Sequence, residues 1–413
     1  MNKSLLVLLL ICSQTALAGD IGNNNSYSPD YLRTLSRNAT TEVDAAFYNP
    51  AGLTYLEDGL HLQLSNQMWD VLIDIHWRDD TYTSRGAALI IPSAAIVYTT
   101  HPFAFFLTYG PKAANGSANV EPTHPYLTQA AENLLIDMIG SDDPDTLALL
   151  ENRRADLELS YLSGGVTAGV SYQPSKHIAW SAGIAVNFMQ ARMLVDAEYQ
   201  FMQMDPTSIR IDALGSGTGV GVQFGVHIRP NDDLDMSINY FDTTALTLKW
   251  EKAEDTTNLL PEKQRRDIPP YLAVGLAYRF LEQFETSCSL TYYMNTEADW
   301  GENPEDQTPL MKLYDDGIDL GVSLQYSINT SWDISGGYNR SWTGAVEASR
   351  NLIETGLDAN SFTLGARFHL NENLSFSGAL TYIGFIDGTN TDETIDYEAI
   401  TWGGGFGISW KAL

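Results

Sequence analysis

The composition of the chain excludes several classes of protein. It has 413 residues, with 52 Asp and Glu against 23 Lys and Arg, and a formal net charge of −29. A surface of this sign repels phosphate backbones and attracts cations, so we do not expect nucleic acid as a partner. This length would suggest two or three soluble domains, but strand-rich barrels exceed that size as one unit.

The first residues, 1–18, have the pattern of a secretory signal peptide with cleavage after Ala18. The apolar run from Leu5 to Cys12 is shorter than the roughly 20 residues of a membrane anchor. Ile11 is a poor residue before a lipoprotein cysteine. Cleavage removes Cys12 and leaves only Cys288, so the mature chain is expected to have no intramolecular disulfide.

Apolar and small or polar residues alternate over much of the remaining chain. In GVGVQFGVHI, residues 219–228, apolar side chains alternate with Gly, Gln and His. The same alternation occurs at 272–280, 318–326 and 374–382. Soluble β-sandwiches also alternate, but strands of about ten residues that end in aromatic residues are typical of a membrane barrel.

The connections between these strands alternate between short and long. Tight turns are predicted at 99–101, 174–176, 230–232, 281–282, 329–331 and 371–373. Long polar segments, expected to be extracellular, are predicted at 70–86, 111–156, 200–207, 251–269, 299–316, 341–358 and 387–396. With strands near 60–68 and 400–410, the pattern predicts an all-β transmembrane fold, one antiparallel outer-membrane β-barrel of about fourteen strands over 59–413.

The long segments are acidic, and one of them has helical spacing. The acidic residues indicate a solvated outer surface more than cation binding, and DDPD at 142–145 lacks the spacing of a calcium loop. Segment 111–156 contains YLTQAAENLLIDMIG and predicts a helical cap over the barrel mouth. We predict no metal, no cofactor and no catalytic residue, because no nucleophile elbow or metal-ligand spacing is present.

Residues 19–58 precede the first strand and do not resemble a membrane span. Asn38 begins a cap-like start, Ala45 to Phe47 continue a short helix, and Pro50 ends it. In this context, SRNATTEVDAAFYNPAGL resembles the N-terminal hatch of the FadL family of outer-membrane transporters for long-chain fatty acids and hydrocarbons. The match to that family's Asn-Pro-Ala motif is Asn49, Pro50 and Ala51.

The resemblance implies that 19–58 forms a helical hatch in the lumen and that the third strand breaks to give a lateral exit. We expect Asn49 to bond the backbone of the wall and so fix the path of the hatch. The segment HPFAFFLTYGPKAANGSA matches the third strand and assigns the opening to Phe103, Phe105, Leu107, Gly110 and Pro111.

The chain departs from the family in two ways. Its predicted helical segment follows the third strand, whereas the family's prototype has a helical extension later in the chain. Its ending, SWKAL, lacks the usual terminal aromatic residue, so we expect Phe406, Ile408 and Trp410 to supply the signal that the barrel-assembly machinery recognises.

Strand parity predicts which side chains face inward, independently of the resemblance. Near the tight turns they are charged, and we expect them to anchor the hatch together with its own arginines: Arg33, Arg37, Asp235, Arg279, Glu285, Asp333 and Arg367. Farther up they are apolar and predict a ligand chamber: Tyr161, Met189, Met193, Ile209, Ile211, Phe241, Tyr293 and Phe385. Packing against the hatch is an alternative role for each of these apolar residues.

The sequence therefore predicts a passive transporter for fatty acids or other hydrophobic small molecules, in the outer membrane of a Gram-negative bacterium. It is expected to be a monomer in contact with outer-membrane lipid. A general diffusion porin and a structural or adhesive barrel with acidic loops remain as alternatives, and an outer-membrane hydrolase has the weakest support.

Overall fold

The computed structural model describes residues 28–115, 119–121, 129, 154–200, 208–255, 261–302, 308–350, 355–392 and 394–412. The predicted signal peptide, the first residues of the predicted hatch (19–27) and most of the predicted helical cap lie outside these ranges.

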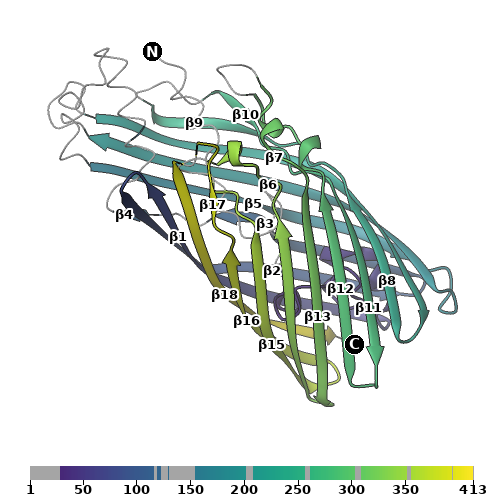
Figure 1. Cartoon of the computed structure of the whole chain (residues 1–413). Coiled ribbons are helices and arrows are strands. Elements are labelled where there is room, and N and C mark those ends of the chain that lie inside the picture. Colours follow the sequence, from purple (N-terminus) through teal and green to yellow (C-terminus); the bar gives the residue numbers. More distant parts are fainter. Residues whose placement is uncertain are drawn as a thin grey trace.

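Fourteen antiparallel strands form a closed barrel, which confirms the predicted fold (Figure 1). The barrel closes because β1 pairs with β2 on one side and with β18 on the other. The strands are β1 (Gly59–Trp77), β2 (Asp80–Thr100), β3 (Phe103–Asn115), β5 (Arg154–Tyr172), β6 (Trp180–Gln200), β7 (Ser208–Asn231), β8 (Leu234–Phe241), β11 (Tyr271–Phe280), β12 (Phe284–Tyr293), β13 (Gly317–Asn329), β14 (Trp332–Trp342), β15 (Ala359–Asn371), β16 (Leu374–Phe385) and β18 (Ile395–Ala412).

Four short strands extend this wall within the long connections. They are β4 (Asn119–Glu121), which pairs with β2, β9 (Thr247–Asp255), which pairs with β7, β10 (Lys263–Arg265), which pairs with β9, and β17 (Gly388–Thr389), which pairs with β18.

Several strands are longer than a bilayer requires, and this corrects one predicted loop. β7 has 24 residues and β2 has 21, whereas a tilted membrane strand needs about 9–11. Segment 70–86, predicted as a long loop, is instead a paired continuation of β1 and β2 that turns at 78–79. Polar side chains such as Arg85 and Asp70, 2.7 Å apart, are compatible with pairing because water can reach both faces beyond the membrane.

The segment predicted as a helical cap, 111–156, is strand at both of its ends. Its first part belongs to β3 and β4, and residues 154–156 belong to β5. The short connections agree better with prediction. The strands on either side of a predicted tight turn are joined by two or three residues, as between β11 and β12 at 281–283, except β5 and β6, which are joined by 173–179.

The outer face of the barrel is apolar. In β11, Leu272, Val274 and Leu276 face outward. Aromatic pairs such as Phe280 and Phe284, with ring centroids 5.4 Å apart, gather near the tight turns. Toward the other end lie Tyr382 and Trp402, with ring centroids 4.7 Å apart. An apolar band with aromatic residues at both borders is typical of barrels that span a membrane.

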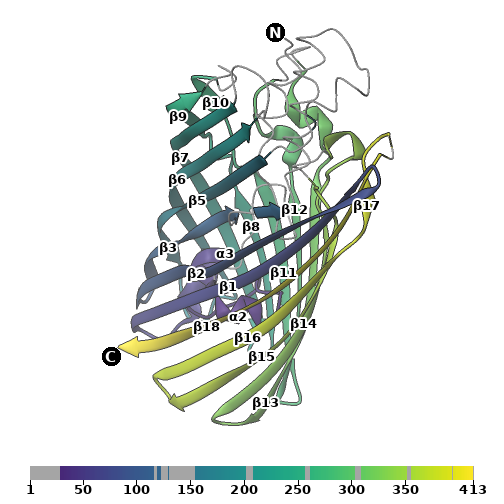
Figure 2. The same ribbon diagram turned by 90° about the vertical axis from the view of Figure 1, so that its left-hand side faces the viewer.

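Two short helices, α2 (Pro29–Leu32) and α3 (Ala45–Tyr48), lie inside the barrel (Figure 2). The 3-10 helix η1 (Pro50–Tyr55) follows α3, while η3 (Asn295–Glu297), η4 (Leu310–Leu313) and η5 (Glu347–Ser349) belong to the long connections. None of the helices in the described part of the chain is long and apolar enough to cross a membrane. We call residues 28–58 the hatch from here on, because they are the described part of the segment predicted as one.

Candidate functional site

The hatch follows the inner wall so closely that glycines of the wall have no room for a side chain. A Cβ atom on any of five inward glycines would lie 1.9–2.5 Å from a hatch atom. The hatch residues and the facing glycines are Leu32 and Gly405, Arg33 and Gly365, Thr34 and Gly337, Leu35 and Gly321, and Ala39 and Gly275. Only glycine permits this approach, so the wall and the path of the hatch are matched.

The Asn-Pro-Ala turn continues this contact on other strands of the wall. The Nδ2 of Asn49 donates to the carbonyl of Val226 at 3.0 Å, the kind of bond to the wall expected for this turn. Its Oδ1 accepts from the backbone N–H of Ala51 at 3.1 Å and so begins η1. Two serines of the wall donate to the turn, Ser171 to the Pro50 carbonyl at 2.5 Å and Ser181 to the Ala51 carbonyl at 2.8 Å.

A buried ionic network ties the hatch to β15. Arg367 of β15 donates to Asp30 at 2.6 Å and to Glu42, while Arg33 donates to the same Asp30 carboxylate at 2.8 Å. Burial alone would raise the pKa of Asp30, but Arg367 and Arg33 outweigh it and hold that pKa well below its usual range. Asp30 is therefore a charged anchor, which sequence reasoning missed although Ser28-Pro29-Asp30 has the form of a helix start.

The two predicted arginine anchors of the hatch differ in their partners. Arg33 also donates to the wall, to Gln325 at 2.6 Å and to Ser335 at 3.2 Å. Arg37 pairs within the hatch, with Asp44 at 2.6 Å. Arg33 thus connects the hatch to the barrel, whereas the ion pair of Arg37 holds the hatch to itself.

The remaining predicted anchors of the wall act less directly or not at all. Asp235 binds Arg229, which in turn donates to Thr41 of the hatch at 2.8 Å. The others pair within the wall: Arg279 with Glu285, and Asp333 with His369. Strand parity therefore identified inward charges, but only some of them contact the hatch.

The ladder between β2 and β3 is interrupted above the hatch. The two strands pair from Thr100–Phe103 to Ala94–Tyr109, and β4 pairs again with β2 at 83–85. Between these ladders, residues 86–93 of β2 have no partner on β3 among the described residues. From Gly110 onward β3 pairs only with β5. We call this interruption the gap.

Both edges of the gap have features that end strand pairing. Pro111 on β3 lies at a bulge, and Pro92 on β2 has no N–H to donate. Asn66 of β1 bonds the carbonyl of Leu89 and the N–H of Ile91 with its side chain. These bonds lie at the bulge in the β1–β2 ladder between Gln67 and Trp69, and they satisfy backbone groups of β2 that this bulge leaves unpaired.

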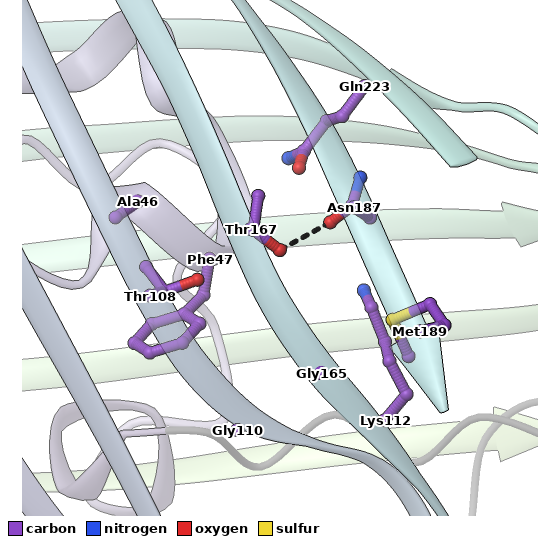
Figure 3. Close-up of a pocket in the computed structure, with 10 residues that line it drawn as sticks. All are labelled: Ala46, Phe47, Thr108, Gly110, Lys112, Gly165, Thr167, Asn187, Met189 and Gln223. Carbon is purple, nitrogen blue, oxygen red and sulfur yellow. Dashed lines mark hydrogen bonds between the residues drawn. The ribbon is translucent and has the colours of Figure 1, made fainter. Parts of the chain in front are cut away.

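A pocket of about 300 Å³, counting the space at its open side, lies beside the gap (Figure 3). Its lining combines the hatch, the edge of β3 and the next strands of the wall, β5 to β7: Ala46, Phe47, Thr108, Gly110, Lys112, Gly165, Thr167, Asn187, Met189 and Gln223. The Lys112 side chain is buried, with its Nζ 3.4 Å from the Tyr271 hydroxyl and 4.3 Å from the ring centroid of Phe241. We call this the gap pocket.

A second pocket, of about 490 Å³ with its open side included, lies between the hatch and β11–β14. It is lined by Tyr31, Leu35, Asn38, Phe47, Tyr48, Tyr271, Ala273, Ser289, Thr291, Tyr293, Asp319 and Asn339. Phe47 of the hatch lines both pockets, so α3 lies between them. We call this second pocket the tyrosine pocket.

Three of the predicted chamber residues meet at these pockets. Met189 lines the gap pocket, Tyr293 lines the tyrosine pocket, and Phe241 stacks on Tyr271 with ring centroids 5.0 Å apart. The others do not line either pocket. Tyr161, Met193 and Ile211 are buried elsewhere, Phe385 packs against the cluster of Leu32 and Trp69, and the side chain of Ile209 is outside the described part.

The residues predicted for the lateral opening are placed on both sides of the wall. Phe103, Phe105 and Leu107 lie on the outer face of β3, and Gly110 and Pro111 lie where its pairing with β2 has ended.

Sequence reasoning missed three residues of these pockets, Lys112, Tyr271 and Asp319. Lys112 directly follows Gly110-Pro111, and a lysine on the inward face of an apolar strand is a signal that could have found it. No comparable local signal marks Tyr271 or Asp319, because their pocket forms only when the hatch is in place.

The closed fourteen-stranded barrel and the segment packed inside it define a class, the plugged barrel of the outer-membrane type. No family model and no curated protein matches the chain.

Solved structures with the same architecture include a FadL homologue of Pseudomonas aeruginosa, with a TM-score of 0.68 and 15% identity over 96% of this chain and 100% of that one. The toluene transporter TodX of Pseudomonas putida has a TM-score of 0.65 and 12% identity, over 96% of this chain and 100% of that one. The toluene transporter TbuX of Ralstonia pickettii has a TM-score of 0.58 and 16% identity, over 90% of this chain and 94% of that one. The chain thus has the fold of the FadL-type transporters, as the hatch motif predicts.

Proposed function

We propose that the protein is a passive channel for hydrophobic small molecules, long-chain fatty acids or hydrocarbons among them, in the outer membrane of a Gram-negative bacterium. In this role the barrel is inserted as a monomer by the barrel-assembly machinery, and lipid covers its apolar outer face. The similar structures named as FadL and toluene transporters support the class of compound.

The observation that carries this proposal is the interrupted β2–β3 ladder beside the gap pocket. A molecule in that pocket has the hatch on one side and the edge of β3 on another, because Phe47 and Gly110 both line the pocket. In this proposal the hatch closes the straight path through the lumen. The gap then offers a sideways path toward the membrane.

An apolar ligand favours the sideways path for a physical reason. Each methylene removed from water contributes about 0.8 kcal/mol, and release into the aqueous periplasm would lose that gain. Exit between β2 and β3 leads the ligand to the lipid at the apolar outer face of the barrel and not into water. The proposal invokes no source of energy, so net movement follows the concentration gradient.

A disulfide across the gap tests this route. In a Cys288→Ser background, Ser93→Cys and Gly110→Cys would join the first two inward positions beyond the last paired rung, Ala94–Tyr109. Uptake of a radiolabelled hydrocarbon should fall in the oxidised gap variant and recover on reduction. Normal uptake through the oxidised, folded gap variant would refute the lateral route.

The matched control for this experiment joins two positions within the intact ladder. Val97→Cys and Phe106→Cys face each other there and line neither pocket, so their disulfide adds a crosslink without closing the gap. Uptake by this variant should be the same in the oxidised and reduced states.

Sugar permeation separates this proposal from a general porin. In a liposome-swelling assay the plugged barrel should admit no sugar, because the hatch occupies the lumen. Swelling at the rate of an open porin would contradict the proposal.

A further inference from the structure

The tyrosine pocket has the composition of a site for a cation. Five aromatic side chains line it, Tyr31, Phe47, Tyr48, Tyr271 and Tyr293, together with one carboxylate, that of Asp319. The faces of aromatic rings attract ammonium groups, and the attraction is strongest where water is excluded. We propose that this pocket binds the ammonium group of a hydrophobic amine or quaternary amine, which makes such compounds a preferred substrate class. This inference rests on the proposed channel function.

The Asp319 carboxylate is held in place and has capacity left for a ligand. Its Oδ2 accepts from the Tyr293 hydroxyl at 3.0 Å. Its Oδ1 is buried and has no hydrogen-bond partner among the described residues. Ser341, opposite Asp319 on β14, is close to this carboxylate and donates its hydroxyl to Asn339 at 2.8 Å. A buried carboxylate without a cation beside it is costly, and the positive charge of a bound ammonium group would offset part of that cost.

The rings are arranged around this carboxylate by both the hatch and the wall. Tyr31 and Tyr48 of the hatch stack with centroids 5.6 Å apart, and Tyr271 and Tyr293 of the wall lie 5.6 Å apart at 58°. The charge of Asp319 also reaches Tyr31, since burial and then this carboxylate raise the pKa of the Tyr31 hydroxyl. Aromatic rings and negative charge therefore line the same space.

The same aromatic wall already holds an ammonium group of the protein. The Nζ of Lys112 lies 4.3 Å from the ring centroid of Phe241 and 5.6 Å from that of Tyr271. This contact is made from the gap pocket, whereas Tyr271 itself lines the tyrosine pocket. These rings thus contact an amine, and the Asp319 carboxylate has to offset the repulsion between Lys112 and a bound ammonium group.

The charge of the whole chain favours the same ligands. The net charge is −29, and exposed carboxylates such as Asp299 and Asp315 lie in the long connections. Such a field raises the local concentration of cations and lowers that of anions. An alkyl chain attached to the ammonium group would extend past Phe47, which the two pockets share, toward the gap pocket.

Three probes with the same alkyl chain test the inference: dodecyltrimethylammonium, dodecanol and dodecanoate. Binding is measured by equilibrium dialysis against the full barrel in lipid nanodiscs, and uptake is measured in cells. The wild type should bind the ammonium probe at least about tenfold more tightly than the alcohol, a difference of roughly 1.4 kcal/mol. Asp319→Asn should abolish this preference, so that the ammonium probe and the alcohol bind with similar affinity. Asp70→Asn, the same change at an exposed carboxylate on the outer part of β1, should have no effect.

A second variant keeps the test valid if Asp319→Asn does not fold. Tyr48→Leu removes one ring from the hatch and leaves the carboxylate in place, so it should weaken binding of the ammonium probe selectively. Equal binding of the three probes by the wild type, or an unchanged preference in the folded variants, would overturn the inference while the channel function stands. If neither the alcohol nor the other probes are taken up, the proposed function fails and the inference with it.

Discussion

The contact between Arg367 and the hatch gives the most direct prediction about how the hatch is held inside the barrel. The substitution Arg367→Gln removes the guanidinium that binds both Asp30 and Glu42. Breaking a buried ion pair costs about 3–5 kcal/mol. Arg33 remains beside Asp30, and the Glu42 side chain is 41% exposed, so the loss is smaller, about 2 kcal/mol. This corresponds to a roughly thirty-fold larger population of undocked hatch.

Trypsin provides the assay, because the hatch contains two buried cleavage sites, Arg33 and Arg37. When opening is fast relative to cleavage, the rate of cleavage follows the undocked population, so Arg367→Gln should be cut roughly thirty times faster. The matched control is Arg279→Gln, since Arg279 pairs with Glu285 of the wall. Cleavage of Arg367→Gln at the wild-type rate, or an equal change in both variants while the barrel remains folded, would refute the role of Arg367 as an anchor.

Three other predictions concern the same hatch. Asn49→Ala removes the bond to Val226 and the cap of η1, worth about 1 kcal/mol, and should impair hydrocarbon uptake in a folded barrel; unchanged uptake would limit the motif to packing. Gly225→Ala should impair uptake in a similar way, because the added Cβ would lie 2.2 Å from the Asn49 Oδ1. Gly378→Ala is the control and should leave uptake unchanged, because its added Cβ would have no neighbouring atom closer than 3.8 Å. The pKa of Asp30 is lowered in the folded state, so Asp30 stabilises the docked hatch above about pH 3.9 and loses this effect as the pH falls further. The conductance of the barrel in a lipid bilayer should therefore be constant from pH 7 to about 4 and rise only below about pH 4. A rise between pH 7 and 5 would contradict that assignment.

Strand parity is what made the wall predictable from sequence. Because side chains alternate with a period of two, Phe241 and Tyr293 were assigned to the inner face, and both are buried there. The turn at Asn49-Pro50 was also predictable, since its bond to the wall uses a local motif. Whether the buried residues bind a ligand stays a prediction.

Contacts between distant parts of the chain could not be predicted in this way. Asp30 and Arg367 are 337 residues apart in the sequence, and no local pattern pairs them. The extension of β1 and β2 through 70–86 was missed because its polar residues were interpreted as a loop, although outside the membrane a strand can be polar on both faces. The tyrosine pocket was missed because the hatch supplies several of its rings, and parity describes only the wall.

The lateral route is the central claim, and the position of the ligand in the gap tests it most directly. A hydrocarbon that carries a photoactivatable diazirine would be added to the outer side of the reconstituted barrel, and the cross-linked peptides would be identified by mass spectrometry. We expect cross-links at Ile91 and Lys112, on the two edges of the gap, and none at the turn between β11 and β12. Cross-links confined to the tight-turn end of the lumen, with none at the gap, would contradict the lateral route.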